Sequence, residues 1–384
     1  MLLRGRHFSN KNLLDLHLQN GLIRGASPAT STPPDLQADW LAPAICDIQV
    51  NGGLGVSFTA DTLDASDLRR VMQACRPHGI GCFLPTVVTA ARQTLVHAFT
   101  ALRTALERDA ELAAAVPGFH LEGPFIAAAD GPRGAHPAQH TRPPDLREFL
   151  HLQECAGGRI RLVTLAPELP GAVDFIRAVT AQGVVVALGH SAAGPDDIRA
   201  AVAAGARLST HLGNGAPRLL PRHANLLWEQ LANDSLWASI ITDGHHLPEA
   251  VLRCIIRCKA AGRLILTCDV SPWGGMPPGR YGQWDQQVDV RPEGKIMLAG
   301  QELLAGSWNF TDHCVTVLSR LRELPADQVL ALATTQPRAL LGLPALTLAP
   351  GEPAHVTAWD EDPEGGLRLK AVVWNGQFLV PGSD

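Results

Sequence analysis

The sequence lacks the features that mark membrane, secreted and nucleic-acid-binding proteins. No run approaches the roughly 18 apolar residues of a membrane span, and the N-terminus carries no apolar signal-peptide segment. No block of like charges occurs, and the net charge of -5 argues against a nucleic-acid surface. The eight cysteines contain no CxxC pair and fit a reduced chain. We therefore expect a cytoplasmic protein that binds neither nucleic acid nor membrane.

What the sequence does contain is an alternation of apolar strands and helical segments that begins near Trp40. Eight βα units in about 300 residues are typical of an α/β protein with a (β/α)8, TIM-like barrel. A doubly wound open sheet is the alternative, although it rarely needs eight units. The longest helical segment covers 92–115. The expected strands cover 45–50, 80–87, 116–121, 160–165, 184–188, 206–210, 237–242 and 264–268.

Both ends of the chain look different from this middle part. The first residues alternate short β-like segments with turns such as Gln19-Asn20-Gly21, and β-like character returns after Ala349. The simplest assembly joins the two ends. We predict a small β-sandwich domain of residues 1–44 plus 347–384, packed beside a barrel of residues 45–346.

The stretch 184–217 carries a histidine at the end of each of two expected strands, His190 and His211. Parallel strands joined by a helix point their carboxyl ends the same way, so these two side chains should lie together. Polar residues recur at the other strand ends, although the strand bodies are apolar. They are Gln49, Asn51, Glu122, Glu168, Asp243, His245, His246 and Asp269.

Two imidazoles and one carboxylate from these strand ends fit a catalytic metal site. Glu122, His190 and His211 would supply three ligands and leave one position open for water. This set suits Zn²⁺, with Fe²⁺ and Mn²⁺ as alternatives. A general base is also needed, and Asp269 at the end of the eighth strand is the best candidate. The alternative is that Asp269 is a structural carboxylate that closes the barrel.

Eight short motifs resemble the N-acetylglucosamine-6-phosphate deacetylase family of the amidohydrolase superfamily. Their order and spacing follow that family over essentially the whole chain, and HLEGP with VTLAPE is the most specific pair. The motifs are DIQVNG (47–52), HLEGPF (120–125), GAHP (134–137), VTLAPE (163–168), GHS (189–191), THLGNGAP (210–217), DGHH (243–246) and LAGS (304–307).

The resemblance assigns roles to the strand-end residues. It makes Glu122, His190 and His211 the metal ligands and Asp269 the general acid and base. Many relatives carry His-x-His where this chain has Gln49-Val50-Asn51, and an amide is a poor zinc ligand, so we expect one metal per chain. The remaining matches imply that His136 contacts the acetyl carbonyl and that the sugar phosphate is bound by Asn214, Gly215, Arg222 and His246.

The activity implied by the resemblance is hydrolysis of the N-acetyl amide of N-acetylglucosamine 6-phosphate. Because the family arginine can reach in from a neighbouring subunit, Arg222 implies a homodimer. Gly213 and Gly215 stand in a segment where the family is bulkier, and Val270 precedes an unusual SPWGGMPPGRY segment. Both departures border the expected sugar pocket and leave the exact substrate open. The second hypothesis is an amidohydrolase for another N-acyl amino sugar, small amide or cyclic imide. A non-catalytic binding homologue is the third, although no predicted ligand has been lost.

Overall fold

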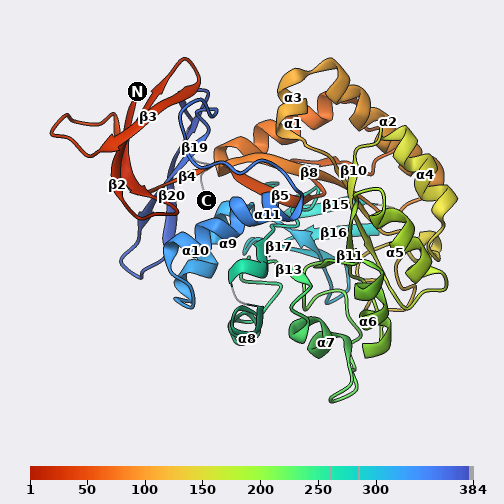
Figure 1. Cartoon of the computed structure of the whole chain (residues 1–384). Coiled ribbons are helices and arrows are strands. Elements are labelled where there is room, and N and C mark those ends of the chain that lie inside the picture. Colours follow the sequence, from red (N-terminus) through yellow and green to blue (C-terminus); the bar gives the residue numbers. More distant parts are fainter. Residues whose placement is uncertain (260, 284–285, 380–384) are drawn as a thin grey trace.

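A parallel eight-stranded sheet forms the centre of the protein (Figure 1). The computed structural model describes residues 1–259, 261–283 and 286–379. Its strands neighbour one another in chain order, and every pair is parallel, as the alternating pattern predicts. The strands are β5 (Ile45–Val50), β8 (Ile80–Val88), β9 (Phe119–Glu122), β10 (Ile160–Leu165), β11 (Val185–Leu188), β12 (Leu208–Ser209), β13 (Trp237–Ile240) and β14 (Leu264–Leu266).

Helices surround this sheet and complete the TIM-like barrel predicted from the sequence. The helix expected over 92–115 is instead divided at Asp109, whose side chain accepts hydrogen bonds from the amides of Glu111 and Leu112 and starts a new helix. The helices are α1 (Ala65–Cys75), α2 (Arg92–Arg108), α3 (Ala110–Ala115), α4 (Leu146–Cys155), α5 (Ala172–Thr180), α6 (Pro195–Ala204), α7 (Leu226–Ala232), α8 (Glu249–Lys259), α9 (Thr311–Arg320), α10 (Ala326–Ala333) and α11 (Thr335–Leu340), with short 3-10 turns η1 (Arg76–His78), η2 (Ala138–His140) and η3 (Ala261–Arg263).

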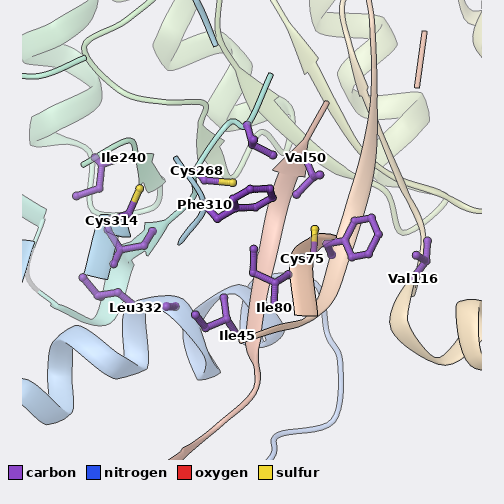
Figure 2. Close-up of a cluster of buried hydrophobic side chains, with 14 of the residues drawn as sticks. Ile45, Val50, Cys75, Ile80, Val116, Ile240, Cys268, Phe310, Cys314 and Leu332 are labelled. Atoms are coloured by element: carbon purple, nitrogen blue, oxygen red, sulfur yellow. The ribbon is translucent and has the colours of Figure 1, made fainter. Parts of the chain in front are cut away.

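The core lies between the barrel strands and the helices. Figure 2 shows part of it, a single cluster to which Ile45, Val50 and Ile80 from the strands and Cys314 and Leu332 from α9 and α10 all belong. Strands covered on both faces need apolar residues at successive positions, which explains why these strands are largely apolar. Inside the barrel a second, smaller cluster includes Ile48, Leu84, Leu162, Leu208 and Ile265.

The contact between β5 and β14 closes the barrel. It is made by backbone hydrogen bonds and by a buried carboxylate. The amide of Asn51 donates to the carbonyl of Val270 at 3.0 Å, next to a parallel bridge between Val50 and Val270. Asp47, which is fully buried, accepts from the backbone amide of Cys268 at 2.8 Å. It also accepts from the hydroxyls of Thr267 and Thr311 and from the amide of Gln49. This carboxylate therefore holds the end of β14 against β5.

A separate seven-stranded sheet is built from both chain ends, and it fits the predicted small β-sandwich domain. In Figure 1 the N-terminal and C-terminal strands lie side by side, and β4 pairs with β19. The exact boundaries at residues 44 and 346 stay a prediction. The strands are β1 (Leu2–His7), β2 (Leu13–Gln19), β3 (Leu22–Pro28), β4 (Leu36–Pro43), β19 (Val356–Glu361), β20 (Leu367–Trp374) and β21 (Gln377–Leu379).

Two further β elements border the carboxyl ends of the barrel strands. One is a short hairpin and the other is a four-stranded antiparallel sheet, which the sequence pattern did not predict. The hairpin consists of β6 (Gly52–Gly53) and β7 (Val56–Ser57), and the sheet of β15 (Gly279–Gln283), β16 (Gln286–Val290), β17 (Lys295–Leu298) and β18 (Leu304–Ser307).

Among the described residues, no helix is long and apolar enough to cross a membrane.

Candidate active site

A cavity of about 280 Å³ opens at the carboxyl ends of the barrel strands. This is the end at which barrel enzymes carry their catalytic residues. Its size suits a small molecule, and most of the polar residues expected from the strand ends contribute to it. The polar residues that line it are Asn51, Glu122, His136, His190, His211, Asn214, His246, Asp269, Ser271 and Glu302.

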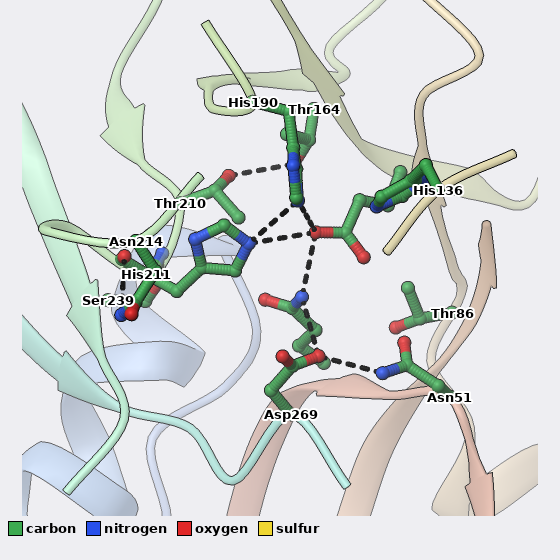
Figure 3. A network of polar contacts seen from close by, with 12 residues as sticks. Asn51, Thr86, His136, Thr164, His190, Thr210, His211, Asn214, Ser239 and Asp269 are labelled. Atoms are coloured by element: carbon green, nitrogen blue, oxygen red, sulfur yellow. Dashed lines mark hydrogen bonds and ion pairs between the residues drawn. The ribbon is translucent and has the colours of Figure 1, made fainter. Parts of the chain in front are cut away.

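Three of these residues converge on one point, and Figure 3 labels two of them, His190 and His211. Glu122 is the last residue of β9, and His190 and His211 follow β11 and β12. The Nε2 atom of His211 lies 3.1 Å from both Glu122 Oε1 and His190 Nε2, and His190 Nε2 lies 3.3 Å from Glu122 Oε1. All three side chains are buried. The backbones of His190 and His211 have φ of 51° and 30°, a strained region that recurs at functional sites.

The chemistry of these three atoms fits a divalent cation. Nδ1 of His190 lies 2.9 Å from the carbonyl of Pro132, which can only accept, so Nδ1 carries the proton. The Nε2 lone pair of His190 then faces a carboxylate oxygen and a second imidazole nitrogen. A positive charge among these atoms, either a proton on an imidazole or a metal ion, would relieve the repulsion between the lone pairs. Metal bonds of about 2.0–2.2 Å at tetrahedral angles place ligand atoms roughly 3.3–3.6 Å apart, close to the observed spacing.

A neighbouring histidine lies close enough to offer a different ligand set. Glu122, His136 and His190 each present one ligand atom, and these atoms lie within 4.8 Å of one another. Nδ1 of His136, however, is 2.8 Å from the Thr89 hydroxyl. In the set that contains His211, every pair of ligand atoms lies within 3.3 Å, so we favour this set. Burial, with a further contribution from His190, lowers the pKa of His136 to about 3, which keeps this ring neutral.

Opposing effects act on the Glu122 carboxyl. Burial alone would raise its pKa, but hydrogen bonds and charge from His190 and His211 outweigh burial and hold the pKa well below its usual range. Glu122 is therefore an anion at neutral pH, as a metal ligand must be.

Asp269 faces the same cavity from the end of β14 and is held by two amides. Its Oδ1 accepts from Nε2 of Gln49 at 2.9 Å and from Nδ2 of Asn51 at 2.7 Å. The same Gln49 nitrogen donates to Glu122 Oε1 at 2.9 Å. Burial and the charge of Glu122 raise the pKa of Asp269 to about 7, although His211, His246 and Asn51 act in the opposite direction. A carboxyl with such a pKa can both take and return a proton near neutral pH.

The predicted substrate residues lie at two different depths. Asn214, Gly215 and His246 line the cavity. Nδ1 of His246 lies 2.8 Å from Asp243 Oδ2. Burial would lower the pKa of His246, but the hydrogen bond and charge of Asp243 outweigh it and raise the pKa. This favours an imidazolium. Arg222 lies instead on an exposed loop and is not among the described residues that line the cavity.

Two strand-end residues from the sequence analysis have other partners. Glu168 accepts from the Ser191 hydroxyl at 2.7 Å and the Ala192 amide at 2.6 Å, which fixes the loop after His190. Nε2 of His245 lies 3.0 Å from the carbonyl of Glu293. Gly213 also differs from expectation, because it does not open space beside Asn214. A Cβ on Gly213 would lie 2.8 Å from Leu247, so Leu247 occupies that space.

Sequence reasoning missed part of the cavity wall. Leu304, Ala305 and Gly306 from β18 line the cavity, together with Ser271 and Pro272. Thr89, which contacts His136, was missed as well. The LAGS motif gave a signal for β18, but without the four-stranded sheet its side of the cavity could not be placed.

The fold and the site together define an amidohydrolase-type barrel enzyme with a candidate metal centre. A deacetylase from Mycobacterium smegmatis, solved as a variant in complex with N-acetyl-D-glucosamine 6-phosphate, superposes with a TM-score of 0.87 and 26% identity over 98% of each chain. N-acetylgalactosamine-6-phosphate deacetylase of Escherichia coli O157:H7 is 33% identical over 366 residues, 94% of each chain.

N-acetylglucosamine-6-phosphate deacetylase of Homo sapiens is 36% identical over 356 residues, which cover 88% of this chain and 83% of the human protein. No protein-family model matches the chain. At this identity and coverage, the chain belongs to the N-acetylglucosamine-6-phosphate deacetylase family.

Proposed function

We propose that the protein hydrolyses the N-acetyl amide of N-acetylglucosamine 6-phosphate to glucosamine 6-phosphate and acetate. The observation that carries this proposal is the buried cluster of Glu122, His190 and His211 beside Asp269, in a cavity of small-molecule size. Relatives that act on N-acetylated sugar phosphates support the substrate class. The same chemistry on another N-acyl amino sugar is the second candidate, because relatives of both the glucosamine and galactosamine type match this chain.

A single divalent ion, Zn²⁺ in preference to Fe²⁺ or Mn²⁺, would be held by Glu122, His190 and His211. When bound, such an ion lowers the pKa of a water molecule and polarises the acetyl carbonyl. Asp269 takes a proton from the attacking water as the new C–O bond forms. It then returns that proton to the amide nitrogen as the C–N bond breaks. Amine and acetate leave, and one water molecule is consumed.

His136 would stabilise the charge that develops on the acetyl oxygen. When the Thr89 hydroxyl donates to Nδ1 of His136, the proton of the neutral ring lies on Nε2. A neutral ring then donates a hydrogen bond without needing a second ionisation, consistent with its lowered pKa. A donor aimed at a developing oxyanion is typically worth about 10²-fold in rate.

The phosphate would be bound by His246 together with Asn214 and Gly215. An imidazolium at His246 supplies a charge-assisted hydrogen bond. Arg222 would complete this set from a second copy of the chain, because its exposed loop lies outside the described cavity lining. This requires a homodimer.

We also propose that the enzyme is cytoplasmic. Its barrel would comprise residues 45–346, and its small domain would comprise residues 1–44 plus 347–384.

Acetate release from a panel of N-acetyl sugars tests the proposal. The panel contains the glucosamine and galactosamine epimers, each with and without the 6-phosphate. We expect the phosphorylated glucosamine derivative to have the highest kcat/KM. Arg222→Ala should lower that value by at least about tenfold while leaving hydrolysis of an unphosphorylated sugar nearly unchanged. No preference for phosphorylated sugars would support the second candidate instead.

A further inference from the structure

Two cysteines contact each other at the end of the barrel opposite the catalytic cavity. Cys46 and Cys82 are register partners on the neighbouring strands β5 and β8. Their sulfur atoms lie 3.3 Å apart, and this is the only contact between two cysteine sulfurs among the described residues. Cys82 stands two residues before Leu84, which packs inside the barrel. Both sulfurs therefore lie in the barrel interior, near the start of the strands.

The surroundings of the two sulfurs make them chemically different. Cys46 is fully buried and donates its hydrogen bond to Cys82, which keeps 7% exposure. The helix α11 packs against β5 (Figure 1) and carries Arg338. The hydrogen bond from Cys46 and the guanidinium of Arg338 lower the pKa of Cys82, although burial and Asp47 oppose them. The hydrogen bond to Cys82, together with burial, raises the pKa of Cys46. Cys82 is therefore the better nucleophile of the pair.

We propose that Cys82 is a site of reversible oxidation by a hydroperoxide and that Cys46 resolves the oxidised sulfur as a disulfide. A cysteine of this kind has thiolate character, some exposure and a second thiol within reach. Neighbouring strands lie about 4.8 Å apart, which is within the Cα range of a disulfide. The sulfurs need to approach by only about 1 Å to reach bonding distance. Neither cysteine lines the described catalytic cavity, so this site is independent of the proposed function.

The oxidation proceeds in two balanced steps. The Cys82 thiolate attacks one oxygen of hydrogen peroxide and the O–O bond breaks, which leaves a sulfenic acid and hydroxide; the hydroxide recovers the proton that Cys82 had released. The Cys46 sulfur then attacks the Cys82 sulfur, the S–O bond breaks, and the leaving hydroxide takes the Cys46 proton and departs as water. The two thiols lose two electrons, and one peroxide becomes two water molecules. Cys46 needs no exposure for this, because its reaction partner is the sulfur beside it.

Peptide mapping of the full-length, zinc-loaded protein tests the site. The protein is treated with hydrogen peroxide at pH 7, its remaining thiols are alkylated in denaturant, and its peptides are identified by mass spectrometry. We expect the peptides of Cys46 and Cys82 to be joined, with two hydrogens fewer than the separate peptides. Dithiothreitol should release them. The exposed Cys254 and Cys258 on α8 are reference thiols in the same sample, because neither has a sulfur in contact.

Cys46→Ala separates the two roles. Without the resolving thiol, Cys82 should proceed to the sulfinic acid, which gains two oxygens and is not reduced by dithiothreitol. Recovery of the Cys82 thiol should fall from nearly complete in the wild type to less than about a tenth. Cys82→Ala is the matched control, and in it the fully buried Cys46 should stay unmodified.

The wild-type protein decides the matter even where a variant does not fold. Cys46 and Cys82 that remain free after Cys254 and Cys258 have been oxidised would overturn the inference. A disulfide that joins Cys82 to any cysteine other than Cys46 would overturn it as well.

Discussion

Two buried polar layers lie one above the other inside the barrel, and they differ in how completely they are hydrogen-bonded. The lower layer is a continuous chain of four contacting side chains, Thr86, His120, Thr164 and Thr210. His120 Nε2 lies 2.8 Å from Thr164 Oγ1, which lies 2.7 Å from Thr210 Oγ1. Burial lowers the pKa of His120 to about 4, so this layer stays neutral. We call these four residues the lower layer.

The mouth layer, which contains Asn51, His190, His211 and Asp269, is less completely hydrogen-bonded. Asn51 Oδ1 and His211 Nδ1 are buried without partners among the described residues. His190, His211 and Asp269 all have positive φ, and the pKa of Asp269 is raised to about 7. Buried polar groups are normally paired and backbones normally relaxed, so departures from both mark where a protein trades stability for function. Polar residues in a barrel are therefore not equivalent, and only the mouth layer is built for chemistry.

The largest effect should follow loss of a proposed metal ligand at the mouth. His211→Ala should reduce bound metal per chain and lower kcat/KM by at least about 10³-fold, since metal activation is worth several kcal/mol. His245→Ala is a matched control, because His245 contacts the Glu293 carbonyl instead. Elemental analysis and acetate release measure both variants. Full metal content in His211→Ala would show that the ligand set is different.

Asp269 should destabilise the metal-free fold when it is ionised. The pKa of Asp269 is higher in the folded than in the unfolded protein. The neutral carboxyl is therefore tolerated in the fold at low pH, and stability is lost as the pH rises from the unfolded pKa through the folded pKa of about 7. In chelator-treated protein, the free energy of unfolding of Asp269→Asn relative to wild type should increase when the pH is raised from 5 to 8. The increase should be at most a few kcal/mol. Denaturant unfolding at both pH values measures this. A difference that does not change with pH would refute the assignment.

The lower layer should respond in the opposite way, through stability alone. Thr164→Val keeps the shape of the side chain but removes the hydroxyl that contacts His120 and Thr210. We expect the free energy of unfolding to fall by about 1–2 kcal/mol. Metal content and kcat should stay close to those of wild type. A large loss of kcat without loss of stability would place this layer in the catalytic machinery and remove the distinction between the layers.

Sequence alone was sufficient to predict the barrel and the grouping of the strand-end residues. The barrel strands are largely apolar, and parallel strands bring their carboxyl ends to one face, so Glu122, His190, His211 and Asp269 could be expected together. The difference between the layers could not be predicted. His120 stands two residues before Glu122, and only coordinates show that one is fully hydrogen-bonded and the other faces a cavity.

Other features depended on contacts between distant segments. The sheet of β15 to β18 supplies Leu304 and Gly306 to the cavity, but it pairs strands across turns that carried no clear hairpin signal. Asp47 joins β14 to β5 through partners 220 and 221 residues away. The break at Asp109 could have been recognised, because Asp followed by Glu two residues later is typical of a helix start.

The most direct test of the mouth layer is to measure kcat and metal content together in Asp269→Asn. The change keeps the size of the side chain and removes the base, so kcat for N-acetylglucosamine 6-phosphate should fall by about 10² or more. Metal should stay near one ion per chain, as in the wild type. Loss of the metal in this variant would make Asp269 a ligand, and a kcat within about threefold of wild type would show that another group moves the proton.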